Sequence, residues 1–139
     1  GHTLLFSAIN IVLAPLLMQA GQRSPYDLTK DLQPIVQVAS APLIVVVSND
    51  LRVNTLRELL DTARADPQGM IYGSGGVGSI NHLGVELLSS MTGVRFVHAP
   101  YPGLGPAITA LLGGQFKMMI ATFPAVLPLI RDGRMRALA

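Results

Sequence analysis

Short apolar segments alternate with amphipathic ones along most of the chain, and this pattern predicts alternating strands and helices. The clearest strand is residues 43–48 (LIVVVS), which is rich in β-branched residues. The clearest helix begins at Thr55, where TLRE forms a capping box, and it ends before Pro67. The expected strands are residues 3–7, 34–39, 43–48, 70–72, 94–98, 116–121 and a last one from 134, and the expected helices are residues 8–19, 55–65, 79–91, 106–112 and 125–130.

This order of elements predicts an α/β fold with a mainly parallel sheet flanked by helices. In such a sheet the turns that follow the strands lie at one edge, and ligands of open α/β folds bind there. We therefore expect the turns at residues 7–10, 73–79, 101–105 and 122–123 to face the same edge of the sheet.

Composition and charge exclude several classes of function. The ten basic and eight acidic residues give a net charge of +2, and they are too scattered to form the basic stripe of a nucleic-acid surface. Because the chain has no cysteine, it has no disulfide, thiol nucleophile or thiolate zinc site. Its solitary acidic residues predict no metal site. Only 13% of the residues are charged, half of the usual ~25%, which indicates much buried surface or docking against more protein.

The apolar segment at residues 3–20 raises the question of a targeting or membrane segment. It lacks the basic start of a signal peptide, it contains Asn10 and Pro15, and its length is marginal for a membrane span. A buried strand followed by a buried helix is the preferred interpretation. Because the chain begins just before one apolar strand and stops inside another, we expect it to be a piece of a longer protein.

The strongest local feature is the glycine-rich turn YGSGGVGS, which ends at Ser79 between a strand and a helix. Glycines let the backbone approach a ligand closely, and the first N–H groups of a helix are free to hold an anion. The hydroxyl groups of Ser74 and Ser79 could add donors. A plain turn with Ser79 as the helix N-cap explains the same residues.

Gly73, Gly75 and Gly78 also spell the dinucleotide fingerprint G-x-G-x-x-G. That motif needs an acidic residue at the end of the next strand, where this chain has VHA, and a phosphate-binding P-loop needs a lysine after the last glycine. Both nucleotide-binding interpretations are therefore rejected. His82 could donate to a carboxylate, but a structural role is favoured for it and for His98, and no catalytic triad or acid–base pair is indicated.

Five segments of the sequence resemble one protein family. They are GHTLLF, PLIVVVSNDLRVNTLRELLDTARADP, YGSGGVGSINHLGVELL, VHAPYPGLGPAITALLGGQ and FPAVLPLIRDGRMRALA, and they extend from one end of the chain to the other. In order and spacing they are similar to the solute-binding proteins of tripartite tricarboxylate transporters, the Bug family.

The resemblance implies a periplasmic-binding-protein fold of type II, with two α/β lobes that close on a ligand. The ligand is a small carboxylate (dicarboxylate, tricarboxylate, amino acid or aromatic acid), held largely by backbone N–H groups and ordered waters. Such proteins work in the periplasm, pass the ligand to membrane permease subunits, need no cofactor and are not enzymes. A signal peptide would precede the present chain.

On this mapping residues 1–41 are part of the first lobe, residues 42–136 are the second lobe, and residues 137–139 are a strand returning to the first. Where relatives often have Asp-Asn after the late strand, this chain has Ala121-Thr122, which weakens any transfer of ligand identity. The implied ligand-binding residues are Ser7, Ala8, Asn10, Ser74, Gly75, Gly78, Ser79, His82, Tyr101, Gly103 and Thr122.

Two other functions remain open at the level of sequence. The first is an α/β enzyme that acts on a phosphorylated or carboxylated metabolite, which needs a general base that the sequence does not reveal. The second is a truncated lobe that acts only by self-association, as a dimer or by strand swapping, because the unpaired edge of a sheet readily pairs with a strand of another chain. The complete protein is expected to be a monomer.

Overall fold

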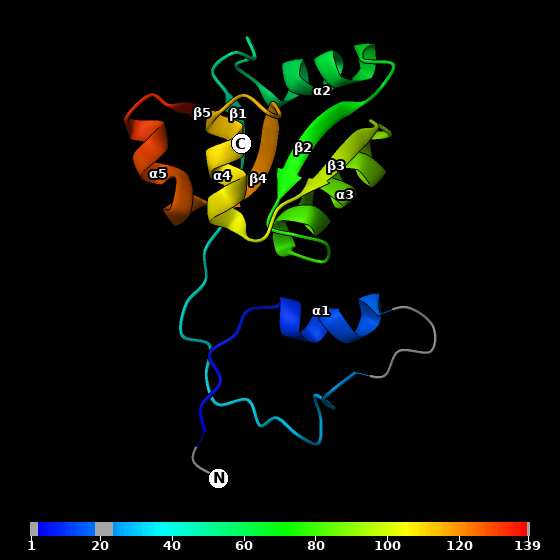
Figure 1. Ribbon diagram of the computed structural model, residues 1–139, viewed down its shortest axis with the longest axis vertical. Coiled ribbons are helices and arrows are strands. Elements are labelled where there is room, and N and C mark those ends of the chain that lie inside the picture. Colours follow the sequence, from blue (N-terminus) through cyan, green and yellow to red (C-terminus); the bar gives the residue numbers. More distant parts are fainter. Residues whose placement is uncertain (1–2, 19–23, 139) are drawn as a thin grey trace. The chain divides into compact units, whose positions relative to one another are not determined.

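A computed structural model describes residues 3–18 and 24–138 of the chain. The chain divides into two units, Gly1–Ser40 and Ala41–Ala139. The larger unit holds every strand of the described residues and is drawn from cyan to red in Figure 1. Among the described residues no helix has the length and apolar character needed to cross a membrane.

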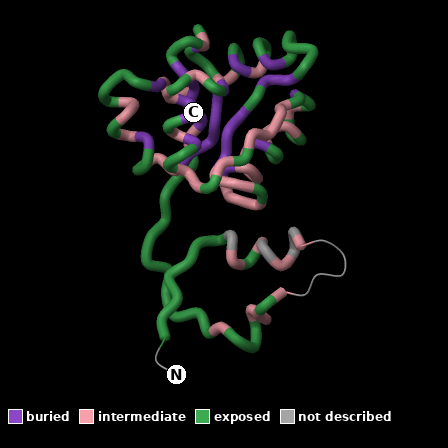
Figure 2. Tube along the Cα trace, viewed as in Figure 1, coloured by how far each residue is buried: buried purple, intermediate pink, exposed green. Residues whose placement is uncertain are grey.

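The smaller unit contains one helix, α1 (Asn10–Leu17), inside the segment predicted as helix. Residue 19, the predicted end of this helix, lies outside the described residues. The strands expected at residues 3–7 and 34–39 are wrong, because both segments lack regular secondary structure. A strand needs a neighbour for its N–H and C=O groups, and the described part of this unit supplies none. Both segments are exposed, as Figure 2 shows in green, and the Phe6 residue is 81% exposed.

The larger unit is a five-stranded sheet with helices on both faces. Its strands lie in the order β3-β2-β4-β1-β5, with β2 parallel to β3 and β4. Strand β1 is antiparallel to both of its neighbours, β4 and β5. All the other strands therefore run in one direction, and the sheet is mixed but mainly parallel. The elements are β1 (Leu43–Ser48), α2 (Leu56–Ala65), β2 (Met70–Ser74), α3 (Ile80–Thr92), β3 (Phe96–Pro100), α4 (Leu104–Leu112), β4 (Met118–Thr122), α5 (Phe123–Arg131) and β5 (Met135–Ala137).

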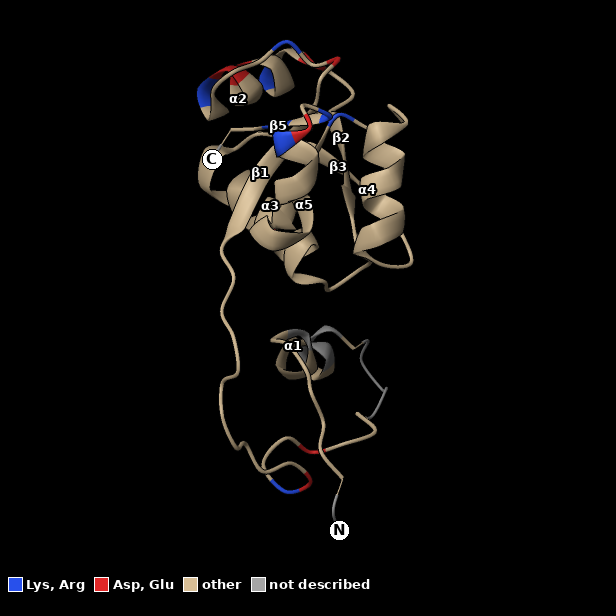
Figure 3. Cartoon of the chain, turned by 90° about the vertical axis from the view of Figure 1, so that its left-hand side faces the viewer, with Lys and Arg blue, Asp and Glu red and all other residues tan. Residues whose placement is uncertain are grey.

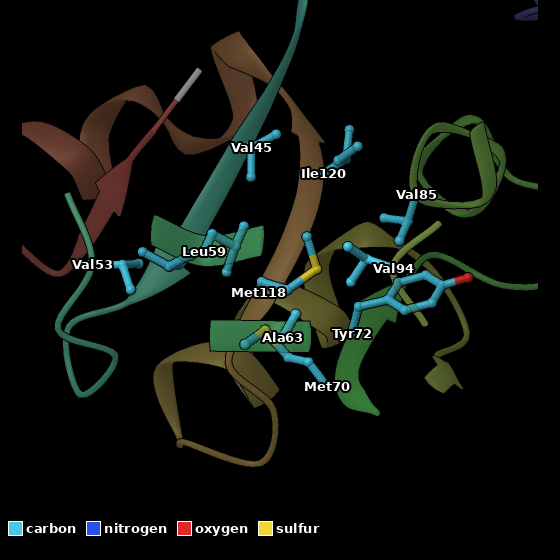
Figure 4. Close-up of a cluster of buried hydrophobic side chains, with 11 residues drawn as sticks. Val45, Val53, Leu59, Ala63, Met70, Tyr72, Val85, Val94, Met118 and Ile120 are labelled. Atoms are coloured by element: carbon cyan, nitrogen blue, oxygen red, sulfur yellow. The ribbon is translucent and has the colours of Figure 1, made fainter. Parts of the chain in front are cut away.

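Two apolar cores lie on opposite faces of this sheet. Side chains alternate along each strand, so neighbouring residues of β4 point to opposite faces. Met118 and Ile120 pack in the core beneath α2 and α3, part of which is drawn in Figure 4. Met119 and Ala121 pack in the core beneath α4 and α5. Covering both faces leaves the ends of the strands, and the turns that follow them, as the accessible edges.

Candidate functional site

Three of the expected turns meet at one edge of the larger unit. They follow β2, β3 and β4, which are parallel, so that they lie at the same ends of the strands and lead directly into α3, α4 and α5 (Figure 1). The fourth expected turn, at residues 7–10, belongs to the smaller unit. Its place at this edge stays a prediction.

The turn after β2 is shaped by glycines that no other residue could easily replace. Gly76 and Gly78 have φ of 118° and 77°, a region that L side chains rarely adopt. Ser79 is the N-cap of α3: its Oγ accepts the N–H of His82 at 3.3 Å and donates to the carbonyl of Gly76 at 2.8 Å. The alternative interpretation of Ser79 as the helix N-cap is therefore confirmed.

Within this turn some N–H groups have acceptors and others do not. Gly76 donates to Ser74 Oγ at 3.1 Å, and Gly78 donates to His82 Nδ1 at 3.2 Å. Among the described residues no acceptor is found for a second set of N–H groups, at Gly75, Val77, Ile80 and Asn81. These donors, at the positive end of a helix, can hold an anion.

The turn after β3 packs closely against the turn after β2. The N–H of Tyr101 donates to the carbonyl of Ser74 at 3.0 Å. A Cβ atom at Gly75 would lie 3.2 Å from the backbone nitrogen of Leu104, the first residue of α4. Gly103, the N-cap of α4, has φ of 120° and again requires glycine. The absence of a side chain at Gly75 therefore lets the N-termini of α3 and α4 come together.

Strand β4 contributes fewer polar groups to this edge than β2 and β3. Asn81, only 5% exposed, donates from Nδ2 to the carbonyl of Ile120 at 2.9 Å and ties α3 to β4. Thr122 is the N-cap residue of α5, but its side chain makes no capping hydrogen bond. Ala121 is buried in the core, so no polar side chain stands at the first position of the Ala121-Thr122 pair.

Three aromatic rings, those of Tyr72, His82 and His98, stack next to the glycine turn. The imidazole rings of His82 and His98 stack with centroids 4.1 Å apart, and His98 also stacks on Tyr72 at 4.9 Å. His98 Nε2 and Ser74 Oγ share a hydrogen bond of 2.6 Å, and Ser74 is fully buried. Sequence reasoning did not foresee the Ser74–His98 pair. The only available signal was that both residues stand near the ends of successive strands.

The edge carries no ionised side chain in the turns themselves. Residues 73–85, 96–116 and 118–130 contain no Asp, Glu, Lys or Arg. In the larger unit these residue types gather at the end marked by α2, as Figure 3 shows. Among the described residues no group of three or more His, Asp or Glu could hold a metal ion. An anion at this edge would therefore be held by backbone N–H groups, because the hydroxyl groups of Ser74 and Ser79 already bond to Gly76 and His98 within the chain.

Burial shifts the pKa values of two titratable groups that pack next to the turn, Tyr72 and His98. Desolvation raises the pKa of the Tyr72 phenol, and its hydrogen bond to the Glu86 carboxylate adds to that rise. Desolvation, together with the nearby His82, lowers the pKa of His98 below its usual value near 6.5, although Glu86 opposes this. His98 therefore favours the neutral state in the folded protein.

We expect the protein to lose stability in mild acid because of His98. Its folded-state pKa is lower than its unfolded-state pKa, so the unfolded chain binds more protons as the pH falls below about 6.5. The free energy of unfolding should then decrease from pH 7.5 to pH 5, and less so in His98→Gln, which keeps a polar atom near the position of Nε2. Urea unfolding of both proteins at the two pH values measures this. An equal decrease in both would contradict the assignment to His98.

Comparison with known proteins places the chain in a family. The family described as "Tripartite tricarboxylate transporter family receptor" matches residues 1–139, and the chain belongs to it. Protein BugT of Bordetella pertussis is 37% identical over 139 residues, which is 100% of this chain and 42% of that protein. The chain thus spans about two fifths of the length of this curated relative.

Solved structures of similar proteins agree with the fold. An R. palustris protein solved with adipate is 35% identical, with a TM-score of 0.78 over 82% of this chain and 38% of that one. A structure described as a periplasmic transporter is 34% identical, with a TM-score of 0.78 over 83% of this chain and 38% of that one. The predicted α/β lobe of a periplasmic-binding-protein fold, with a mainly parallel sheet flanked by helices, is confirmed. The family is one of solute-binding receptors rather than enzymes.

Proposed function

We propose that the complete protein is a periplasmic solute-binding receptor that holds a small carboxylate between two lobes and passes it to the permease subunits of a tripartite tricarboxylate transporter. The larger unit supplies the second-lobe half of the cleft, and residues 1–41 supply part of the first lobe. The observation that carries the proposal is the set of acceptor-free N–H groups at the uncharged turn edge. Family membership and the adipate found with one relative support the same ligand class.

The proposed ligand contacts come from loops of both lobes. Ser74 ends β2, Gly75, Gly78 and Ser79 stand in the turn that follows it, and His82 lies in the first turn of α3. The main anion donors of this region are the acceptor-free N–H groups of Gly75, Val77, Ile80 and Asn81. The turns after β3 and β4 add Tyr101, Gly103 and Thr122, and the smaller unit adds Ser7, Ala8 and Asn10. Binding requires no cofactor and no bond is broken, so the receptor is not an enzyme.

Isothermal titration of the complete protein with adipate tests this function. Adipamide is the matched control, because it has the same length but carries, in place of each carboxylate, an uncharged amide with one acceptor oxygen and one NH2 donor group. We expect adipate, or another dicarboxylate of a chain-length series, to bind with a Kd in the micromolar range, and adipamide to give no heat. Equal binding of the amide and the acid, or no binding by any carboxylate, would contradict an anion site.

A further inference from the structure

Both ring nitrogens of His82 face partners within the chain. Nδ1 accepts the N–H of Gly78 at 3.2 Å, and Nε2 lies 3.8 Å from Oε1 of Glu86. A nitrogen that accepts a hydrogen bond carries no proton. The ring is therefore neutral in this arrangement, with its proton on Nε2 and directed toward Glu86.

The orientation of the His82 ring is fixed by its neighbours. His98 from β3 stacks on it at 4.1 Å with an angle of 23° between the rings. Glu86, one turn further along α3, is itself held by the Tyr72 hydroxyl from β2, which donates to Oε1 at 2.6 Å. The side chain of His82 is only 17% exposed. Residues from β2, β3 and α3 thus hold the ring in one position.

The two stacked imidazoles hold alternate N–H groups of the glycine turn. His82 accepts from Gly78 directly. His98 acts through Ser74, whose Oγ bonds to His98 Nε2 at 2.6 Å and accepts from Gly76 at 3.1 Å. Between and beside these two fixed groups lie the acceptor-free N–H groups. A turn whose backbone is fixed before the ligand arrives loses less conformational entropy on binding.

We propose that His82 is a positioning residue for anion binding: its neutral ring holds the Gly78 N–H through Nδ1, and protonation of that nitrogen releases the turn, so that carboxylate affinity falls in acid. This inference rests on the proposed carboxylate-binding function. It also assigns His82 a role other than direct contact with the ligand, because both of its ring nitrogens already face groups of the chain.

Attraction between an imidazolium ion and the bound anion opposes this effect, but the structure limits it. A second proton on His82 can be added only at Nδ1, which removes the acceptor of Gly78. The Glu86 carboxylate, 3.8 Å from Nε2, offsets the added positive charge. The other titratable groups packed against the ring are His98 from β3, whose lowered pKa favours the neutral imidazole, and Tyr72 from β2, whose raised pKa favours the neutral phenol. The loss of the fixed turn is therefore the larger effect.

Three forms of the complete protein separate this role from a structural one. Adipate affinity is measured by titration calorimetry at pH 8 and pH 5 for the wild type, His82→Asn and His82→Leu. Asn Oδ1 can occupy the position of Nδ1 and accept from Gly78, but it does not titrate. Leu has a similar volume and no acceptor. Because all three share the titration of adipate itself, His82→Asn is also the control for protonation of the ligand.

We expect His82→Asn to bind within about twofold of the wild type at pH 8, and His82→Leu to bind about fivefold to tenfold more weakly, as for one lost hydrogen bond. From pH 8 to pH 5 the wild type should lose at least threefold more affinity than His82→Asn. Equal affinity of His82→Leu and the wild type at pH 8, or the same loss in acid for His82→Asn and the wild type, would overturn the proposal.

Nitrogen NMR of His82 in the wild-type complete protein gives an answer that needs no variant. At pH 8 we expect Nδ1 to show the shift of an unprotonated nitrogen, and its protonation in acid to move the amide resonance of Gly78. A protonated Nδ1 at pH 8 would overturn the proposal even if the variants do not fold. If no carboxylate binds while Nδ1 accepts from Gly78, the proposed function fails and the positioning of the turn stands.

Discussion

Replacing Ser79 by aspartate should abolish carboxylate binding by the complete protein without unfolding it. Aspartate is as good an N-cap as serine, so α3 should still begin at Ile80. Its carboxylate, however, would stand beside the acceptor-free N–H groups of Ile80 and Asn81. Two like charges about 4 Å apart near a protein surface repel by about 4 kcal/mol, which predicts a loss of affinity of more than about 100-fold.

The matched control is Ser79→Asn, which keeps the cap without the charge. Asparagine Oδ1 can accept the N–H of His82, and its Nδ2 can donate to the Gly76 carbonyl, as the serine hydroxyl does. Calorimetric titration with adipate and thermal unfolding of both variants measure the two effects separately. Unchanged affinity in Ser79→Asp would remove this turn from the binding site. Equal losses in both variants would show that the charge is not the cause.

Gly73→Ala should cause the largest loss of stability among single-methyl additions to the larger unit. A Cβ atom at Gly73 would overlap the Cζ and Cε1 atoms of Phe116. Phe116 is only 2% exposed and packs in the core beneath α4 and α5, so its ring has little room to move. Overpacking of this kind costs about 1–3 kcal/mol, a large part of the stability of an ordinary domain. Urea unfolding followed by circular dichroism measures the loss.

A double-mutant cycle assigns that loss to the overlap with Phe116. Phe116→Leu removes the ring, so Gly73→Ala should cost at least about 1 kcal/mol less in its presence than in the wild type. Gly105→Ala is the control, since no atom lies within 4 Å of a Cβ there and the position is helical. It should be neutral or slightly stabilising. Equal costs of Gly73→Ala with and without Phe116 would refute the overlap as the cause.

The regular part of the fold could be predicted because local pattern determines it. The strand at residues 43–48 and the cap at Thr55 occur as expected, with Thr55 Oγ1 accepting the Glu58 N–H at 3.2 Å. The direction of β1 could not be predicted in this way. Its apolar run fits a strand of either direction, and only pairing with β4 and β5 makes it antiparallel.

The remaining differences also come from contacts between distant residues. The strands expected at residues 3–7 and 34–39 have suitable side chains but no pairing partner among the described residues. At the site, the glycine turn was predicted from its composition. The bond between Ser74 and His98 joins residues 24 positions apart, and it depends on the pairing of β2 with β3. No spacing rule along the chain predicts such a contact.

Because the anion donors at the turn edge are backbone groups, recognition of charge is separated from recognition of shape. Every residue except proline has an N–H group, so substitution of the residues in these turns that are not glycines, such as the exposed Val77, would leave the donors in place. The side chains around them are free to change the length, bulk and polarity of the acid that fits. Over evolution, a site of this design can change from one carboxylate ligand to another while the N–H groups that bind the negative charge stay in place.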